Sequence, residues 1–336
     1  MSSLVIQTSF LGDTVLTTPL IARLAETGAV DVLVTPAAAG LLAHDPAIRD
    51  TIVYDKRGRD RSVAGFTRLA GALRAKRYDT VYLAQGSARS GALALASRSP
   101  RRVGFATSAG RAFYTTRVQA PAGMHHAERI FTLGSAGGGR PYSRDDLRPR
   151  LYPGAAEREA VDALLRLGGH DGTPLIAFAP GSVWGTKRWP HYPGLARLLR
   201  GRARIVIVGG RDDAPLAEAI AIAAGDERVI DATGKLTLLA SAELIGRVQA
   251  IVTNDSAPLH LASAMGTPTV AIFGPTVPAF GFGPLAPRSS IVEDDLLACR
   301  PCDRHGPRSC PLGHWKCMLQ QSPERVAGII TGYLTS

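Results

Sequence analysis

Residues 250–273 read AIVTNDSAPLHLASAMGTPTVAIF, and this stretch decides the fold class. Residues 250–253 form an apolar run of strand length, and residues 257–265 place apolar side chains at helical spacing. Residues 269–273 form a second apolar run. A strand, a helix and a strand in this order predict two parallel strands joined by a crossover helix.

The same alternation extends over both halves of the chain. In the first half it predicts strands at 4–6, 30–35, 51–54, 80–84 and 101–105, and helices at 15–25 and 66–74. In the second half it predicts strands at 175–179, 204–208, 250–253 and 269–273, and helices at 191–199, 214–224, 238–245 and 257–265. Glycines and prolines over residues 135–153 mark a boundary. We therefore predict an α/β protein with two doubly wound, Rossmann-like domains, 1–150 and 151–336, facing a central cleft.

Composition limits the class of protein further. Of the 336 residues, 45% are apolar and 20% charged, which excludes a disordered, collagen-like or coiled-coil chain. No apolar run approaches the roughly 18 residues of a membrane span, and no secretory signal precedes the first strand. We expect a cytoplasmic protein.

The positive charge is concentrated in the first half. Residues 1–150 hold 21 Lys and Arg against 11 Asp and Glu, whereas residues 151–336 hold 18 against 17. This asymmetry indicates an acidic partner for the first half, which can be nucleic acid, an anionic membrane surface or an anionic substrate. The alternative is a solubilising surface in an arginine-rich chain, because only five of the 39 cations are lysines.

Two turns at the ends of strands carry candidate catalytic groups. In TSFLGD at residues 8–13, Gly12 allows a tight turn and Asp13 stands at the start of a helix. Asp13 is either a helix cap or a general base at the edge of the cleft. In APGSVWGTKRWP at residues 179–190, Ser182 and Lys187 are candidates for phosphate contacts; the alternative is a solvated surface loop.

The segment TNDSAPLH at residues 253–260 predicts an anion site. A buried strand ends here, Asp255 or Ser256 caps the next helix, and Pro258 falls in its first turn. The free N–H groups of that turn attract anions. His260 lies one turn further on and either reaches the same anion or is an ordinary surface histidine.

Other motifs exclude some cofactors and leave one open. VGGRDD at residues 208–213 lacks the full dinucleotide fingerprint, so Asp212 is a candidate for ribose contacts rather than part of a dehydrogenase. No Asp-x-Asp is present to hold pyrophosphate through a metal. The thiols Cys299, Cys302, Cys310 and Cys317 have partly irregular spacing, which fits either a structural zinc site or reduced free thiols.

Taken together, these segments resemble the ADP-heptose:lipopolysaccharide heptosyltransferases, which form glycosyltransferase family 9. The matching stretches are FLGD at 10–13, PG at 180–181 with KRWPHY at 187–192, and TNDS at 253–256 with His260. FGPT at 273–276 and the Cys-rich tail are also similar to members of the family. The resemblance runs in order from residue 4 to about 330 and is strongest to the heptosyltransferase II branch.

The resemblance implies a GT-B-type glycosyltransferase. Such an enzyme would move heptose from ADP-L-glycero-D-manno-heptose to the lipid A–inner core of lipopolysaccharide, inverting the anomeric carbon without a catalytic metal, at the inner membrane surface. It implies that the first domain binds acceptor and the second binds donor, with Asp13 as base and Lys187 on phosphate. By position, the implied donor contacts are Ser182, Asp212, Leu236, Asp255, Ser256, Ala257, Pro258, Leu259 and His260. The acceptor candidates are Gly12, Lys56, Arg57, Arg59 and Arg61.

One departure from the family pattern leaves the donor open. Family members usually carry glycine after Asn-Asp-Ser/Thr, whereas this chain has Ala257-Pro258, which narrows the approach to the donor. The alternatives are therefore a transferase with another sugar donor or a nucleotide-sugar epimerase on the same fold. A nucleic-acid-binding protein is disfavoured because no helix-turn-helix or RNA-stacking motif is present. The sequence sets no oligomeric state.

Overall fold

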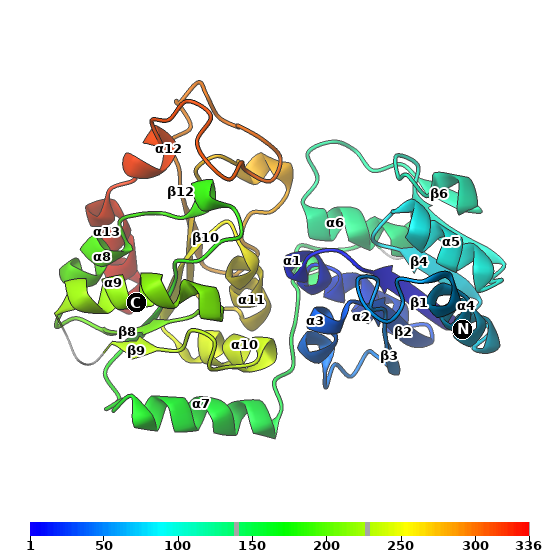
Figure 1. The fold of residues 1–336 in the computed structure, drawn as a ribbon, viewed down its shortest axis with the longest axis horizontal. Helices are drawn as coiled ribbons and strands as arrows, with labels where there is room; N and C mark the ends of the chain where they lie inside the picture. The colour runs from blue at the N-terminus through cyan, green and yellow to red at the C-terminus, as the bar shows by residue number, and fades with distance from the viewer. Residues whose placement is uncertain (138–140, 226–228, 336) are drawn as a thin grey trace. The chain divides into compact units, whose positions relative to one another are not determined.

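The computed structural model describes residues 1–137, 141–225 and 229–335, and the chain divides into two compact units, Met1–Tyr152 and Pro153–Ser336 (Figure 1). Part of the glycine-rich stretch that marks the expected boundary, residues 138–139, lies outside the described residues. No helix found in the described part of the chain combines the length and the apolarity that crossing a bilayer requires.

The first unit is built on a six-stranded parallel sheet in the order β3-β2-β1-β4-β5-β6. Its strands are β1 (Ser2–Gln7), β2 (Ala29–Val34), β3 (Asp50–Val53), β4 (Thr80–Leu83), β5 (Arg101–Phe105) and β6 (Thr116–Val118). Its helices are α1 (Leu11–Val15), α2 (Thr18–Ala25), α3 (Pro36–Ala39), α4 (Val63–Ala75), α5 (Ala88–Ala96) and α6 (His126–Phe131). The central strands are buried on both faces, as continuous apolar runs predict.

The second unit repeats this plan, with the order β12-β11-β10-β7-β8-β9. Its strands are β7 (Leu175–Ala179), β8 (Arg204–Ile207), β9 (Ile230–Asp231), β10 (Ala250–Asn254), β11 (Thr269–Ile272) and β12 (Ser289–Val292). Its helices are α7 (Ala155–Leu167), α8 (Tyr192–Leu198), α9 (Ala214–Ala224), α10 (Leu238–Arg247), α11 (Ala257–Met265), α12 (Lys316–Leu319) and α13 (Pro323–Leu334). In Figure 1, α8, α9 and α13 lie on one side of this sheet and α10 and α11 on the other.

Both sheets have a topological switch point, where the strand order reverses. It lies between β1 and β4 in the first unit and between β7 and β10 in the second. Ligands of open α/β sheets bind outside the carboxyl ends of the strands at such points. The loops after β1, β7 and β10 are the ones that carry Asp13, Lys187 and Asp255.

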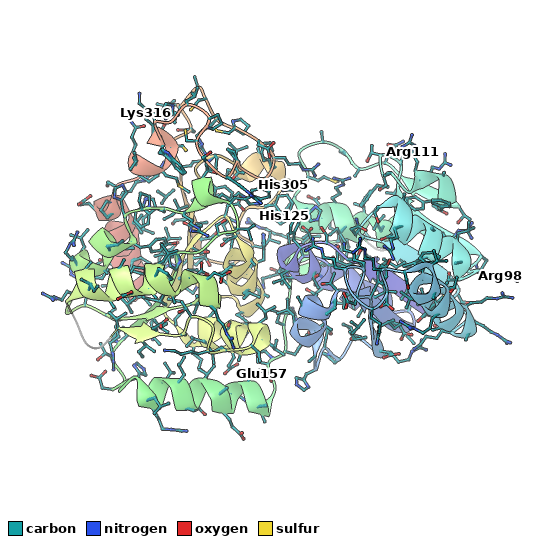
Figure 2. The ribbon with its side chains drawn as sticks, in the orientation of Figure 1. Arg98, Arg111, His125, Glu157, His305 and Lys316 are labelled. Atoms are coloured by element: carbon teal, nitrogen blue, oxygen red, sulfur yellow. The ribbon has the colours of Figure 1, made fainter. Side chains whose placement is uncertain are left out.

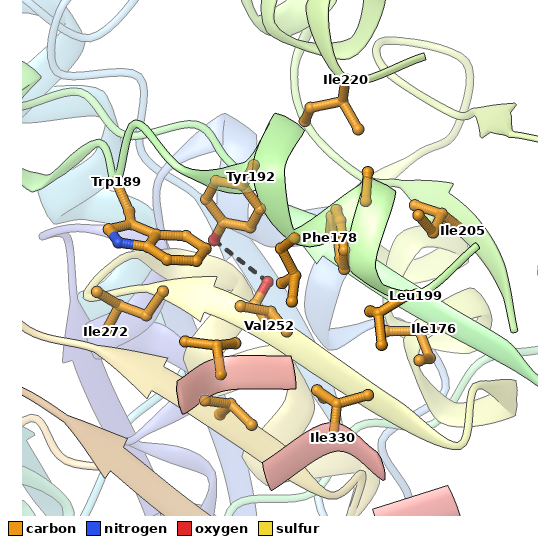
Figure 3. Close-up of a cluster of buried hydrophobic side chains, with 14 of the residues drawn as sticks. Ile176, Phe178, Trp189, Tyr192, Leu199, Ile205, Ile220, Val252, Ile272 and Ile330 are labelled. Atoms are coloured by element: carbon orange, nitrogen blue, oxygen red, sulfur yellow. Dashed lines mark hydrogen bonds between the residues drawn. The ribbon is translucent and has the colours of Figure 1, made fainter. Parts of the chain in front are cut away.

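A buried aromatic cluster holds the loop after β7 in place (Figure 3). The Tyr192 hydroxyl donates to the carbonyl oxygens of Ala179, at 3.1 Å, and Val252, at 3.3 Å. The Trp189 indole N–H donates to the carbonyl oxygen of Gln321 at 2.9 Å. Burial raises the pKa of the Tyr192 hydroxyl well above its usual range, so it remains a neutral hydrogen-bond donor. The far end of the loop is therefore fixed in the core.

The helix predicted at 15–25 is confirmed over residues 18–25, which form α2, but it does not begin at residue 15, because Val15 ends the separate helix α1. Pro19 lies at the N-terminus of α2, where it has no N–H to continue a helix from residue 15. The Thr17 hydroxyl donates to the Asp13 carbonyl oxygen at 2.7 Å across the junction. The break makes α1 a short separate helix.

Candidate active site

Asn254, the last residue of β10, joins the two loops of the second unit that leave the sheet at its switch point. Its side chain is fully buried, and its amide N–H donates to the Pro180 carbonyl oxygen at 2.8 Å. Its side-chain oxygen accepts from the Trp189 backbone N–H at 3.3 Å. One amide thus fixes both ends of the loop that carries Lys187.

Lys187 and Asp255 form an ion pair on these two loops. The Lys187 ammonium lies 2.6 Å from Asp255 Oδ2, and the Thr276 hydroxyl donates to the same oxygen at 2.8 Å. The side chains of Lys187 and Asp255 are only 10% and 11% exposed. The solvated-loop alternative for Lys187 is therefore wrong.

Of the two predicted caps of α11, Ser256 occupies the N-cap position, but its side chain makes no capping hydrogen bond. Asp255 does not cap the helix because its carboxylate accepts from Lys187 and Thr276. Ala257 and Pro258 are half-buried in the first turn, which Leu259 anchors in the core.

His260 is buried, so the surface-histidine alternative is wrong. Its side chain is only 5% exposed, and its ring lies 6.2 Å from that of Phe282, centroid to centroid.

The structure places the remaining predicted donor residues on separate loops. The Ser182 hydroxyl accepts from the Trp184 N–H at 3.2 Å, which closes a local turn. Asp212 is exposed, and its neighbour Asp213 makes the capping contact with the Gly210 N–H at 2.9 Å. Leu236 is half-buried just before α10. Within the described residues, none of these three side chains hydrogen-bonds to Lys187 or Asp255.

In the first unit, Asp13 lies in the first turn of α1. The N-cap residue is Phe10 and not Asp13, so the cap interpretation of this carboxylate is wrong. The carboxylate is 14% exposed, and its Oδ1 lies 3.4 Å from Nε2 of His126, the first residue of α6. Gly12 is buried inside α1 and is not among the glycines with positive φ, so the predicted tight turn is wrong as well.

The four cations of residues 56–61 do not share one environment. The Lys56 ammonium donates to the Thr8 carbonyl oxygen at 2.5 Å, at the end of β1. Burial and then the charges of Arg57 and Arg89 lower the pKa of Lys56. Arg57, Arg59 and Arg61 are exposed, and Arg59 lies 3.5 Å from the buried Asp60 carboxylate. Lys56 therefore supports the loop that leads to Asp13, whereas the three arginines face solvent.

Comparison with known proteins identifies the family. The sequence model of glycosyltransferase family 9 (heptosyltransferase) matches residues 66–315. The chain belongs to this family.

Relatives match this glycosyltransferase along its whole length. It is 28% identical to lipopolysaccharide heptosyltransferase 2 of Salmonella typhimurium over 340 residues, which cover 97% of this chain and 96% of that one. The structure is similar to ADP-heptose lps heptosyltransferase II of E. coli, with a TM-score of 0.80, 26% identity and coverage of 100% and 99%. It also shares its fold with E. coli heptosyltransferase WaaC solved with ADP, with a TM-score of 0.76, 21% identity and coverage of 99% and 100%. These matches confirm the predicted α/β, GT-B-type fold.

The Cys-rich segment, residues 299–317, packs against the loop that carries Lys187 in this glycosyltransferase. The Thr186 hydroxyl donates to the Pro307 carbonyl oxygen, and the ring of His305 (labelled in Figure 2) stacks on Trp184 at 6.2 Å between centroids. The buried Arg300 guanidinium donates to the Thr276 carbonyl oxygen at 2.9 Å and to Glu293 at 2.8 Å. The segment therefore packs against the loops that follow β7 and β11.

The four thiols do not form a metal-binding group as they stand. Across residues 1–137, 141–225 and 229–335, no three His, Cys, Asp or Glu side chains are placed to share one metal ion. Cys299 Sγ lies 3.9 Å from His314 Nε2. A structural zinc ion therefore stays a prediction.

We expect Cys310 to react faster with iodoacetamide than Cys302 or Cys317. Burial raises the pKa of the Cys310 thiol, but hydrogen bonds from the backbone N–H groups of residues 312–315 outweigh burial, so the pKa of Cys310 is lowered. Burial, and then the charge of Cys299, raises the pKa of Cys302, and burial raises that of Cys317 to about 11. Only the thiolate is nucleophilic, so Cys310 leads at about pH 8.

Peptide mass spectrometry after brief labelling of this glycosyltransferase measures the order. Cys302 is exposed and Cys310 is only half-exposed, so accessibility alone predicts the reverse order. Faster labelling of Cys302 would show that exposure, and not ionisation, controls these thiols.

Three residues of the site were missed by sequence reasoning, namely Asn254, Thr276 and His126. Asn254 and Thr276 stand inside stretches already singled out: Asn254 is the last residue of β10, and Thr276 lies in the loop after the neighbouring strand β11. That position was a usable signal, since the carboxyl ends of parallel strands meet at one edge. His126 lies 113 residues from Asp13, and no local pattern indicates that they meet.

Proposed function

We propose that this chain transfers heptose from ADP-L-glycero-D-manno-heptose to the inner core of lipopolysaccharide, inverting the anomeric carbon in a single displacement. The observation that carries the proposal is the Lys187–Asp255–Thr276 cluster beside the uncapped start of α11. It occurs in a chain similar over its whole length to lipopolysaccharide heptosyltransferase 2 of Salmonella typhimurium.

On the donor side, the cluster supports binding of a pyrophosphate without a metal. Lys187 supplies an ammonium group that the buried Trp189 and Asn254 hold in place. The N–H groups at the start of α11 supply further donors to an anion. Charge develops on the departing ADP in the transition state, where such fixed donors stabilise it most. The ADP in the WaaC structure, which shares the fold, agrees with an ADP-linked donor.

On the acceptor side, Asp13 is the proposed general base. Its carboxylate takes the proton of the acceptor hydroxyl while that oxygen bonds to the anomeric carbon and the bond to ADP breaks. Attack from the face opposite ADP inverts the anomeric carbon, and the transition state has oxocarbenium character. The acceptor is the lipid A–inner core at the inner membrane surface, so the enzyme would work as a peripheral cytoplasmic protein without nucleic acid as partner.

A panel of ADP- and UDP-linked sugars tests this function. A ligand that binds the folded chain raises the melting temperature by mass action, and a true donor should in addition give transfer to purified inner-core acceptor. Stabilisation by ADP-linked rather than UDP-linked sugars, with transfer from ADP-heptose alone, supports the proposal. Epimerisation or hydrolysis of a nucleotide sugar without acceptor would favour the epimerase alternative. Transfer only from another nucleotide sugar would show that the donor is not ADP-heptose.

Neutralising the three exposed arginines is expected to raise the KM for acceptor about tenfold at low salt. Each cation near an anionic surface contributes up to roughly 1 kcal/mol, and salt screens the effect. Arg57, Arg59 and Arg61 are changed to glutamine, while Lys56 is kept because it supports the β1 loop. ADP affinity should not change, because the donor cluster belongs to the second unit.

A matched control removes the same charge from the other end of the strands of the same sheet. Arg74, Arg77 and Arg98 are exposed and lie just before β4 and β5, at the amino ends of these strands, whereas residues 57–61 follow the carboxyl end of β3. Equal acceptor KM values for the two triple variants at low salt would show that residues 57–61 are not where the acceptor lands.

Chelation by EDTA is expected to leave transfer largely intact, because the proposed donor site needs no metal. If the Cys-rich segment binds zinc, chelation lowers the melting temperature instead, since a structural metal stabilises the fold. Metal analysis of the purified protein separates the two cases. Less than about 0.1 zinc per chain would reject a four-thiolate site.

A further inference from the structure

The proposed base Asp13 lies beside a second side chain, His126, that can affect how it takes a proton. His126 Nε2 lies 3.4 Å from Asp13 Oδ1, and the two side chains are 17% and 14% exposed. They are thus sheltered but still open to a substrate hydroxyl. The distance is long for a hydrogen bond, and catalytic contacts of this kind commonly tighten when substrate binds.

The fold fixes where His126 points. His125 (labelled in Figure 2) is the N-cap of α6, and its Nδ1 accepts from the Ala127 N–H at 3.2 Å. Ala127, Ile130 and Phe131 of α6 are buried in the core of the first unit. His126 is the first helical residue, so the cap and the buried face together hold its backbone while its ring contacts α1.

We propose that His126 is a positioning residue for the general base, an inference that rests on the function proposed above. In its neutral form it donates Nε2–H to Asp13 Oδ1 and leaves Oδ2 to take the acceptor proton. Protonated His126 places a cation against the carboxylate and weakens it as a proton acceptor. The rate should therefore fall at acidic pH when His126 takes up a proton, in addition to any fall from protonation of the base itself.

Few other groups around the pair titrate near neutrality. The remaining titratable side chains of α6, and those of α2 and of the 3-10 helix Asp145–Leu147 that pack against it, are His125, Glu128, Arg129, Arg23, Glu26, Asp145 and Asp146. Arg23 pairs with Glu26 at 3.2 Å, Glu128 accepts from Tyr142 at 3.1 Å, and Arg129 lies over the Phe105 ring. Within this set, only His125 is another histidine, which makes it the appropriate control.

The test is the pH dependence of kcat/KM for acceptor in wild type, His126→Gln, His126→Ala and His125→Asn. Glutamine keeps an N–H donor that does not titrate, so H126Q should retain most activity near pH 8. In this variant the fall of kcat/KM on the acidic side of the profile should shift to lower pH by about one pH unit or more. H126A loses the donor and should fall about tenfold to a hundredfold. Asparagine at 125 retains a cap acceptor, and H125N should keep the wild-type profile.

The outcomes separate this inference from the proposed function. An acidic limb that is unchanged in H126Q, while Asp13→Asn is inactive, overturns the role of His126 and leaves Asp13 as the base. Near-normal activity of Asp13→Asn overturns the base itself. Melting temperatures are measured for every variant, and a folded H126A with the wild-type rate and profile also overturns the proposal.

Discussion

Replacing Asp13 with asparagine is expected to lower the turnover number about 10²-fold or more, the usual contribution of a general base. Asparagine has the shape of aspartate but cannot take the acceptor proton. Because the Asp13 side chain does not cap α1, its loss should leave that helix intact. Donor affinity should not change either, since Lys187 and Asp255 belong to the second unit. Single-turnover transfer and ADP calorimetry measure the two quantities separately.

Asp13→Glu is the matched control for this variant. It keeps a carboxylate but moves it by one methylene, so its rate should lie between those of wild type and Asp13→Asn. If Asp13→Asn transfers heptose at a near-normal rate with an unchanged melting temperature, Asp13 is not the general base.

Much of the fold could be predicted because its information is local. The apolar runs of β1, β7 and β10 are buried strands, and the helix predicted at 257–265 is α11. Errors came where a competing local effect overrides the pattern, as where Pro19 separates α1 from α2. Strand β12 was missed because SSIV has only two apolar residues and remains largely exposed at the sheet edge.

The candidate site was predicted as separate parts rather than as an arrangement. Lys187 and Asp255 were each singled out from their own loops, but their pairing across 68 residues depends on β7 and β10 being neighbours. A sequence pattern shows that strands are parallel without giving their order in the sheet. For the same reason the sequence left Asp255 and Ser256 as alternative caps of α11, whereas in the structure Ser256 is the N-cap residue and the ion pair uses the Asp255 carboxylate.

Replacing Lys187 with alanine is expected to weaken ADP binding and slow transfer together. A hydrogen bond to a charged group contributes roughly 1.5–3 kcal/mol, which corresponds to about tenfold to a hundredfold in Kd. The same lysine also acts on the departing ADP, so kcat should fall as well. Calorimetry with ADP and steady-state transfer measure the two effects.

The alanine variant has a second consequence, because it leaves the nearly buried Asp255 carboxylate with Thr276 but without its cation. Removing one partner of a buried ion pair is strongly destabilising, so the melting temperature of Lys187→Ala should fall. Asp255→Asn in the same chain removes the uncompensated charge and should restore much of that stability. It should not restore ADP affinity, because the ammonium group is still missing. A double variant that regains both stability and affinity would show that Lys187 acts only by balancing Asp255, and an unchanged Kd in Lys187→Ala would contradict contact with the pyrophosphate directly.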